Sequence, residues 1–134
     1  MSFTTKFRQQ HDEILALVGE LNQLLKGGAE AEALRSVLSN LAGKISFHLA
    51  MEDKALYPRL AKMDEKTSKL ANKFMEEMGG LGGTFAAYNG KWQVSAIRAD
   101  RAGFAAATQT VFAALGKRIA RENAELYPLA DRTA

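Results

Sequence analysis

Apolar side chains recur along the chain in alternating steps of four and three residues, the spacing that places them on one face of an α-helix. This pattern predicts four long helices, over about residues 4–26, 30–57, 65–90 and, starting between 94 and 100, up to 127. No segment alternates polar and apolar residues as a half-buried strand does. Four helices with short connections favour an all-α fold, an up-down-up-down antiparallel four-helix bundle, formed by residues 1–134 as a single domain.

The same steps give the inward positions of this bundle. They are Phe7, His11, Ile14, Val18, Leu21 and Leu25; Leu34, Leu38, Leu41, Ile45, His48 and Glu52; Phe74, Met78, Leu81, Phe85, Tyr88 and Trp92; and Phe104, Thr108, Val111, Leu115, Arg118 and Glu122. In an antiparallel bundle, the start of each odd-numbered helix lies beside the end of the helix that follows it. We therefore expect the polar inward residues and Met78 to form one layer near one end. Ionisable groups are costly there unless they are paired or bind a metal.

The ends of the helices are also predicted from the sequence. Gly27 and Gly28 should end the first helix, and Pro58 and Pro128 should end the second and fourth, with one further turn after Pro58 as an alternative. Four glycines in the segment Gly79–Gly83 cost the third helix about 4 kcal/mol relative to alanine. They indicate either a break or kink, or a cavity or close helix contact beside the polar layer. In either case this helix should be the least stable.

Composition narrows the classes of function. The 134 residues are 47% hydrophobic with only two prolines, which favours a folded core over disorder. The absence of cysteine excludes disulfides, thiolate metal sites and covalently attached haem. A net charge of +3 without a dense basic run does not favour a nucleic-acid partner. Because no signal peptide or bilayer-spanning run is present, we expect a cytoplasmic protein without a membrane partner.

An internal repeat marks the polar layer. Residues 48–58 recur as residues 118–128, with a glutamate four positions after the leading residue and then Leu-Tyr-Pro. Residues four apart lie one above the other on a helix and can share a buried ion. The first copy begins with His48, the commonest type of metal ligand, whereas the second begins with Arg118, which cannot act as a ligand.

These residues resemble the hemerythrin-like (HHE cation-binding) domains, in which a histidine and then His-x-x-x-Glu occur twice along a four-helix bundle. The resemblance covers nearly the whole chain. His11 matches the first element, and His48-x-x-x-Glu52, followed by Leu-Tyr-Pro, matches the second. Met78 and Arg118 stand where the second repeat should have histidines, so four of six ligands are present. The family holds a non-haem di-iron centre that binds oxygen, acts in sensing, or handles nitric oxide and iron.

The remaining ligands, His11, His48, Glu52 and Glu122, would form a set of two histidines and two carboxylates. Such a set suits ferrous iron, manganese or zinc. The resemblance and this donor set together imply at most one metal ion, with dioxygen, nitric oxide or a small anion as its ligand. Protein partners are not predicted.

An alternative is a metal-free structural or signalling and interaction bundle. Here Arg118 would fork onto Glu52 and Glu122 and replace the charge of the missing ion. The charge balance mildly favours this empty site, or a single metal with an anionic ligand. A b-type haem between His and Met is disfavoured by the carboxylates and the arginine. No nucleophile-base set is present, so we do not predict an enzyme. Tyr57 and Tyr127 are expected to close the end of the bundle, with hydrogen bonding to the metal ligands as the alternative.

Overall fold

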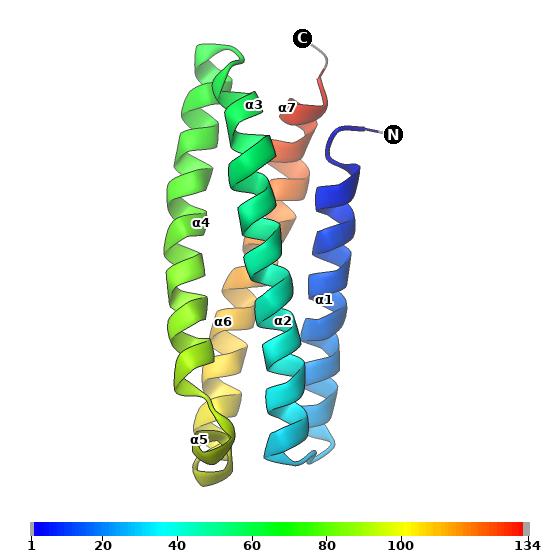
Figure 1. Ribbon diagram of the computed structural model, residues 1–134, viewed down its shortest axis with the longest axis vertical. Helices are drawn as coiled ribbons and strands as arrows, with labels where there is room; N and C mark the ends of the chain where they lie inside the picture. The colour runs from blue at the N-terminus through cyan, green and yellow to red at the C-terminus, as the bar shows by residue number, and fades with distance from the viewer. Residues whose placement is uncertain (1, 133–134) are drawn as a thin grey trace.

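A computed structural model describes residues 2–132 of the chain and confirms the predicted all-α fold. Its four long helices are α1 (Thr5–Lys26), α2 (Ala31–Met51), α4 (Glu65–Lys91) and α6 (Arg101–Arg121). Three short helices, α3 (Tyr57–Ala61), α5 (Val94–Ala99) and α7 (Tyr127–Asp131), and two π-helical turns, η1 (Glu52–Leu56) and η2 (Glu122–Leu126), complete it. Figure 1 shows the long helices side by side, with both ends of the chain at the same end of the bundle.

The connections follow from local chemistry. Gly28 has a φ of 75°, a left-handed conformation that glycine adopts without strain, and the turn after α1 therefore closes where the sequence predicts. Asp64 and Asp100 cap α4 and α6, because each carboxylate accepts a hydrogen bond from the backbone N–H three residues further on. The fourth predicted helix is divided at Asp100 into α5 and α6. Helix α1 contacts α2 and α6, and α4 contacts the same two helices.

The prediction that the two prolines end their helices is wrong, whereas the alternative of one further turn after Pro58 is confirmed, because the chain is helical to Ala61. Each helix passes instead through a π-helical turn, in which the N–H of Tyr57 bonds to the carbonyl of Glu52 and the N–H of Tyr127 bonds to that of Glu122. Proline lacks an N–H and its ring would clash with the carbonyl four residues earlier, so a wider turn accommodates it. The chain then remains helical to Ala61 and Asp131.

Helix α4 is continuous through its four glycines, so of the two alternatives the break is not observed. A Cβ atom on Gly82 would lie 3.3 Å from Leu49 Cδ1 of α2, which is a close helix contact. A Cβ atom on Gly79, Gly80 or Gly83 would meet no atom within 4 Å. Only one of the four glycines therefore serves close packing between helices.

The core consists of two apolar clusters separated along the bundle. The larger begins at Ile14 and Ile45 and extends away from the chain ends, and the smaller surrounds Phe7, Phe74 and Tyr127 near the chain ends. The predicted inward positions are buried except Val18, Leu25, Leu81 and Arg118, which are partly exposed. Between the two clusters, the inward positions of the helices carry the four predicted metal ligands.

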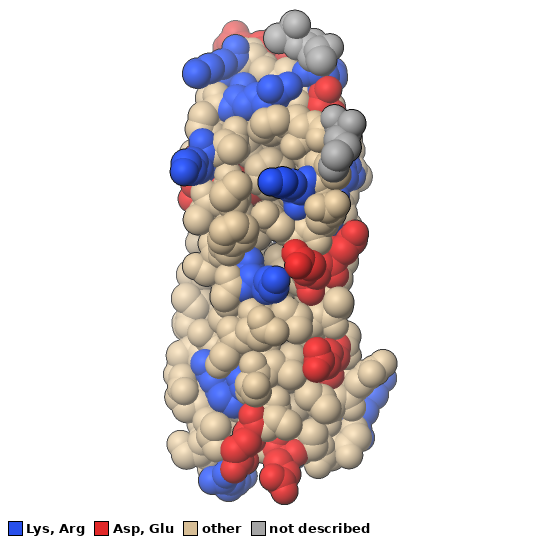
Figure 2. Space-filling model, turned by 45° about the vertical axis from the view of Figure 1, so that its right-hand side comes forward, with Lys and Arg blue, Asp and Glu red and all other residues tan. Residues whose placement is uncertain are grey.

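On the surface in Figure 2, basic and acidic side chains are interspersed and separated by uncharged areas. No helix among residues 2–132 combines the length and the apolar character that a bilayer span requires.

Candidate metal centre

The structure brings the four predicted ligands together. Each of His11, His48, Glu52 and Glu122 offers one donor atom, and these atoms all lie within 4.8 Å of one another. His11 comes from α1 and His48 from the last turn of α2, while Glu52 and Glu122 are the first residues of the two π-helical turns. All four side chains are at most 2% exposed. That they bind a metal remains a prediction.

The donor atoms face one another across the bundle. His11 Nε2 lies 3.0 Å from Glu122 Oε1, and His48 Nε2 lies 3.4 Å from Glu52 Oε2 and 3.9 Å from Glu122 Oε1. The His11–Glu122 contact joins the first helix to the last π-helical turn. It therefore exists only once the bundle has closed.

Two side-chain amides orient the imidazoles. Gln10 Oε1 lies 2.6 Å from His48 Nδ1, and Asn123 Oδ1 lies 2.9 Å from His11 Nδ1. Because an amide oxygen only accepts hydrogen bonds, each Nδ1 carries the proton and each Nε2 is directed to the cluster. Such a partner on the second ring nitrogen is typical of histidines that bind metals. The sequence analysis missed both amides, although each is the immediate neighbour of a predicted ligand.

Tyr127 contributes a fifth polar atom to the cluster, its hydroxyl oxygen. Its hydroxyl donates a hydrogen bond of 2.6 Å to Glu52 Oε2 and lies 3.1 Å from His11 Nε2 and 3.4 Å from His48 Nε2. The ring stacks on the His11 imidazole at a centroid distance of 5.1 Å. Both roles expected for this tyrosine are seen, since its ring packs in the apolar cluster near the chain ends and its hydroxyl hydrogen-bonds to the predicted ligands.

Without an ion, the cluster balances its charge with protons. Burial lowers the pKa of His48, but hydrogen bonds and negative charge from Glu122 and Glu52 outweigh it and raise that pKa to about 9. Burial raises the pKa of Glu52. Burial acts in the same direction on Glu122, but His11 and His48 outweigh it and lower the pKa of Glu122. A cation entering the cluster would therefore displace protons.

Arg118 does not contact the cluster's carboxylates, so the prediction that it forks onto Glu52 and Glu122 is wrong. Its guanidinium forms an ion pair with Glu77 of α4 and lies 5.3 Å from the ring centroid of Phe74. The long side chain reaches the partly exposed edge of the bundle, where 14% of it is accessible to solvent. Met78 is buried as predicted, with 5% of its surface exposed.

Two carboxylate oxygens of the cluster are unsatisfied. Among the described residues, Glu52 Oε1 and Glu122 Oε2 are buried and have no hydrogen-bond partner. The same holds for the Tyr57 hydroxyl and for Arg118 Nη1, whose contact with Glu77 is an ion pair only. Burial, together with the negative charges of Glu52 and Glu122, raises the pKa of Tyr57. Buried polar atoms normally have a partner, so the two free carboxylate oxygens fit a cluster that binds a cation.

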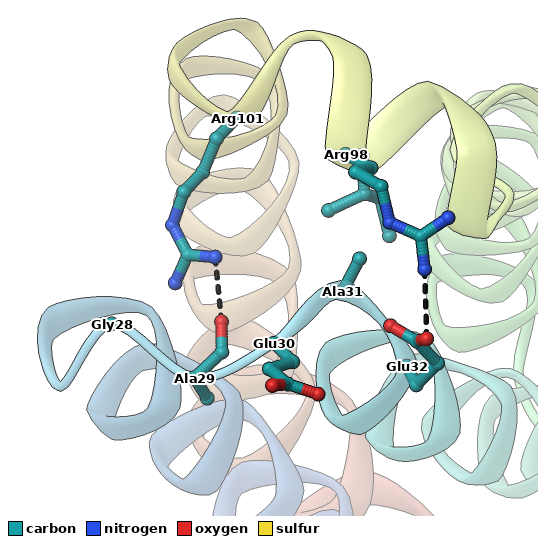
Figure 3. A pocket seen from close by; sticks show the side chains of 8 residues that line it. Gly28, Ala29, Glu30, Ala31, Glu32, Arg98 and Arg101 are labelled. Atoms are coloured by element: carbon teal, nitrogen blue, oxygen red, sulfur yellow. Dashed lines mark hydrogen bonds and ion pairs between the residues drawn. The ribbon is translucent and has the colours of Figure 1, made fainter.

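A hollow of about 450 Å³ lies at the other end of the bundle, between α5 and the connection from α1 to α2 (Figure 3). Arg98 points to Glu32, with 2.7 Å between Nη2 and Oε2, and Arg101 donates to the backbone carbonyl of Ala29. Arg98 is therefore ion-paired, whereas Arg101 is held by an uncharged backbone carbonyl. These contacts tie the start of α2 to α5 and the connection after α1 to α6.

Residues 2–130 match the family model described as hemerythrin, the hemerythrin HHE cation binding domain. No curated protein and no solved structure matches the sequence significantly. The family match spans almost the whole chain, including every residue of the buried His/Glu cluster. The chain therefore belongs to the hemerythrin family of HHE cation-binding domains.

Proposed function

We propose that this protein binds a single metal ion, iron as is usual in the family, through His11, His48, Glu52 and Glu122. The observation that carries the proposal is the orientation of the two imidazoles. Gln10 and Asn123 occupy both Nδ1 positions, which leaves both Nε2 atoms directed at the carboxylates. A histidine that only fills space in the core needs no such partner on Nδ1, and here two histidines at the same level of the bundle both have one.

The donor set suits one ion rather than two. Two imidazoles and two carboxylates are sufficient for one ferrous, manganese or zinc ion. At the second metal position of the family, the two histidines are replaced by Met78 and Arg118. Met78 offers only a soft thioether, and Arg118 is a cation paired with Glu77, so neither suits an iron ion. We therefore propose that the second metal position of the family is lost in this chain.

The position of Arg118 also changes the charge balance. Because Glu77 neutralises Arg118, one divalent ion is balanced by Glu52 and Glu122 without any further anion. We propose that the small ligand is an uncharged diatomic molecule, dioxygen or nitric oxide, rather than an anion. An iron ion would supply an open coordination position and a redox couple, and the apolar clusters on both sides favour a neutral ligand over an anion.

We propose a binding or sensing role rather than catalysis, in keeping with the family. A metal-free structural or interaction bundle is the second candidate, because Tyr127 and the two histidines already form a hydrogen-bonded network with the carboxylates. In such a metal-free bundle, protons bound within the cluster, and not the guanidinium of Arg118, balance the negative charge of Glu52 and Glu122. A cytoplasmic location remains a prediction.

Metal content separates the two candidates. The protein is expressed in iron-supplemented medium, purified without chelator and analysed for metals, beside a His48→Gln variant and a control with the exposed Gln9 changed to alanine. We expect about one iron per chain in the wild type and in Gln9→Ala, and far less in His48→Gln. A wild-type protein that holds no metal, and whose melting temperature does not rise on addition of ferrous or zinc ions, would establish the metal-free bundle.

A further inference from the structure

We propose that Tyr127 is a fifth protein ligand of the metal ion, which it binds through its phenolate oxygen in the ferric state. This inference rests on the proposed metal site and adds a ligand to it. The hydroxyl oxygen already contacts three of the four donor atoms in the cluster. No other tyrosine among residues 2–132 hydrogen-bonds to a predicted ligand.

Two of the three distances from the Tyr127 oxygen to the predicted ligands are those of atoms that share an ion, and the third, to Glu52 Oε2, is that of a short hydrogen bond. Nitrogen and oxygen ligands bind at about 2.1 Å, so two ligands of one ion are about 3.0 Å apart at a right angle and about 3.4 Å apart in a tetrahedron. The Tyr127 oxygen lies 2.6 Å from Glu52 Oε2, 3.1 Å from His11 Nε2 and 3.4 Å from His48 Nε2. His11 Nε2 and Glu122 Oε1, both predicted ligands, have the same kind of separation, 3.0 Å.

The ring of Tyr127 is held in place on several sides. The side chain is fully buried, stacks on His11 and packs against Phe7 at a centroid distance of 5.9 Å. Its backbone N–H closes the π-helical turn on the carbonyl of Glu122. One turn of the chain therefore positions both the Glu122 carboxylate and the Tyr127 oxygen at the cluster.

The charge of the layer also favours a phenolate on a ferric ion. A ferrous ion is balanced by Glu52 and Glu122 alone, with Tyr127 still protonated. A ferric ion carries one more positive charge, and loss of the Tyr127 proton restores neutrality in a buried site where net charge is costly. In this exchange the phenol O–H bond breaks, an O–Fe bond forms and the proton leaves to solvent. The electron that the iron loses goes to ferricyanide, the oxidant added in the test.

Tyr57 supplies a matched control. It occupies the corresponding position in the first Leu-Tyr-Pro segment and is also buried, with 6% of its surface exposed. Its hydroxyl, however, has no hydrogen-bond partner in the described chain, whereas that of Tyr127 contacts the cluster. Removing either hydroxyl changes the same atom in the same sequence context, but only the Tyr127 hydroxyl should matter for the colour of the iron protein.

The test uses one equivalent of ferrous iron, added without air and then oxidised with ferricyanide. We expect a visible phenolate-to-iron charge-transfer band in the wild type and in Tyr57→Phe, and its loss in Tyr127→Phe although elemental analysis still finds iron. An unchanged band in Tyr127→Phe, or no such band in iron-loaded wild type, would overturn the role of Tyr127. A wild type that takes up no iron would instead overturn the metal site itself.

A second measurement does not depend on the folding of Tyr127→Phe. Resonance Raman spectra of the oxidised, iron-loaded wild type and of Tyr57→Phe should both show the ring vibrations of an iron-bound tyrosinate. Loss of these vibrations in Tyr57→Phe would show that Tyr57, and not Tyr127, is the ligand. Their absence from both proteins would show that no tyrosine binds the ion.

Discussion

Arg118 pairs with Glu77 on the neighbouring helix α4, and not with the glutamate that follows it by four residues on its own helix. Glu77 also accepts from Arg121, so one carboxylate at the edge of the bundle serves two cations. The pairing lowers the pKa of Glu77, because the charges of Arg118 and Arg121 outweigh the opposing effect of desolvation. The guanidinium of Arg118 is thereby directed to Glu77 and not to the carboxylates of the cluster.

Removing this partner should weaken the fold modestly. We expect Glu77→Gln to cause a small but measurable loss in the free energy of unfolding, since the pair is only partly shielded from water. Glu125→Gln removes a more exposed partner of Arg121 and should cost less. Urea unfolding at low and high salt measures both effects. If Glu77→Gln proved no more destabilising than Glu125→Gln, Arg118 would have another partner in solution.

The orientation of His48 can be tested through its amide partner. Gln10→Leu removes the acceptor for the Nδ1 proton, and the loss of such a partner typically lowers metal affinity about 10- to 100-fold. Gln9→Ala, on the exposed side of the same helix, should leave the affinity unchanged. Competition with a chelator of known affinity measures both. Equal affinities for the two variants would show that Gln10 does not orient the imidazole.

Restoring the missing histidines tests the register of the four helices. The double variant Met78→His with Arg118→His should raise the iron content from about one to about two ions per chain, because each new imidazole takes the place of a side chain unsuited to hold iron. Each single variant should remain near one. Elemental analysis of the three proteins decides the matter. A double variant that folds but gains no second ion would argue against the proposed equivalence of the two halves.

The metal-free protein should lose stability as the pH rises. The pKa of His48 is about 9 in the fold against 6.5 for an ordinary histidine, so its contribution is complete below pH 6.5 and disappears through about pH 9. At about 1.4 kcal/mol per pKa unit, this contribution is at most about 3 kcal/mol. Thermal unfolding in the presence of a chelator measures it, and His48→Gln should show a flatter profile. A stability that rose over the same range would contradict the assignment.

The glycines of α4 offer a route to a more stable protein. Gly83→Ala should increase the free energy of unfolding by about 1 kcal/mol, because alanine favours the helix and its methyl group meets no atom within 4 Å. Gly82→Ala should gain less, since its Cβ would lie 3.3 Å from Leu49. Chemical unfolding of the two variants compares them directly. Equal gains would indicate that the contact between α4 and α2 yields easily.

Predictions drawn from residues close together in the sequence were least accurate at the two prolines and at Arg118. A π-helical turn directly before Pro58 and Pro128 accommodates each proline, and α-helix continues through both. The sequence predicts that Arg118 forks onto Glu52 and Glu122, in place of the missing second ion. Glu77 is closer in the folded bundle, and nothing in the spacing along one helix reveals it.

The sequence by itself determined the four helices, the inward faces and the depth at which His11, His48, Glu52 and Glu122 meet, because helical periodicity and antiparallel connection fix both facing and level. Only the tertiary structure decided which partners those side chains have. Gln10 and Asn123 orient imidazoles on other helices, and Tyr127 reaches Glu52 from the far end of the chain. Such contacts depend on how the helices are rotated and spaced, which periodicity along each helix does not specify.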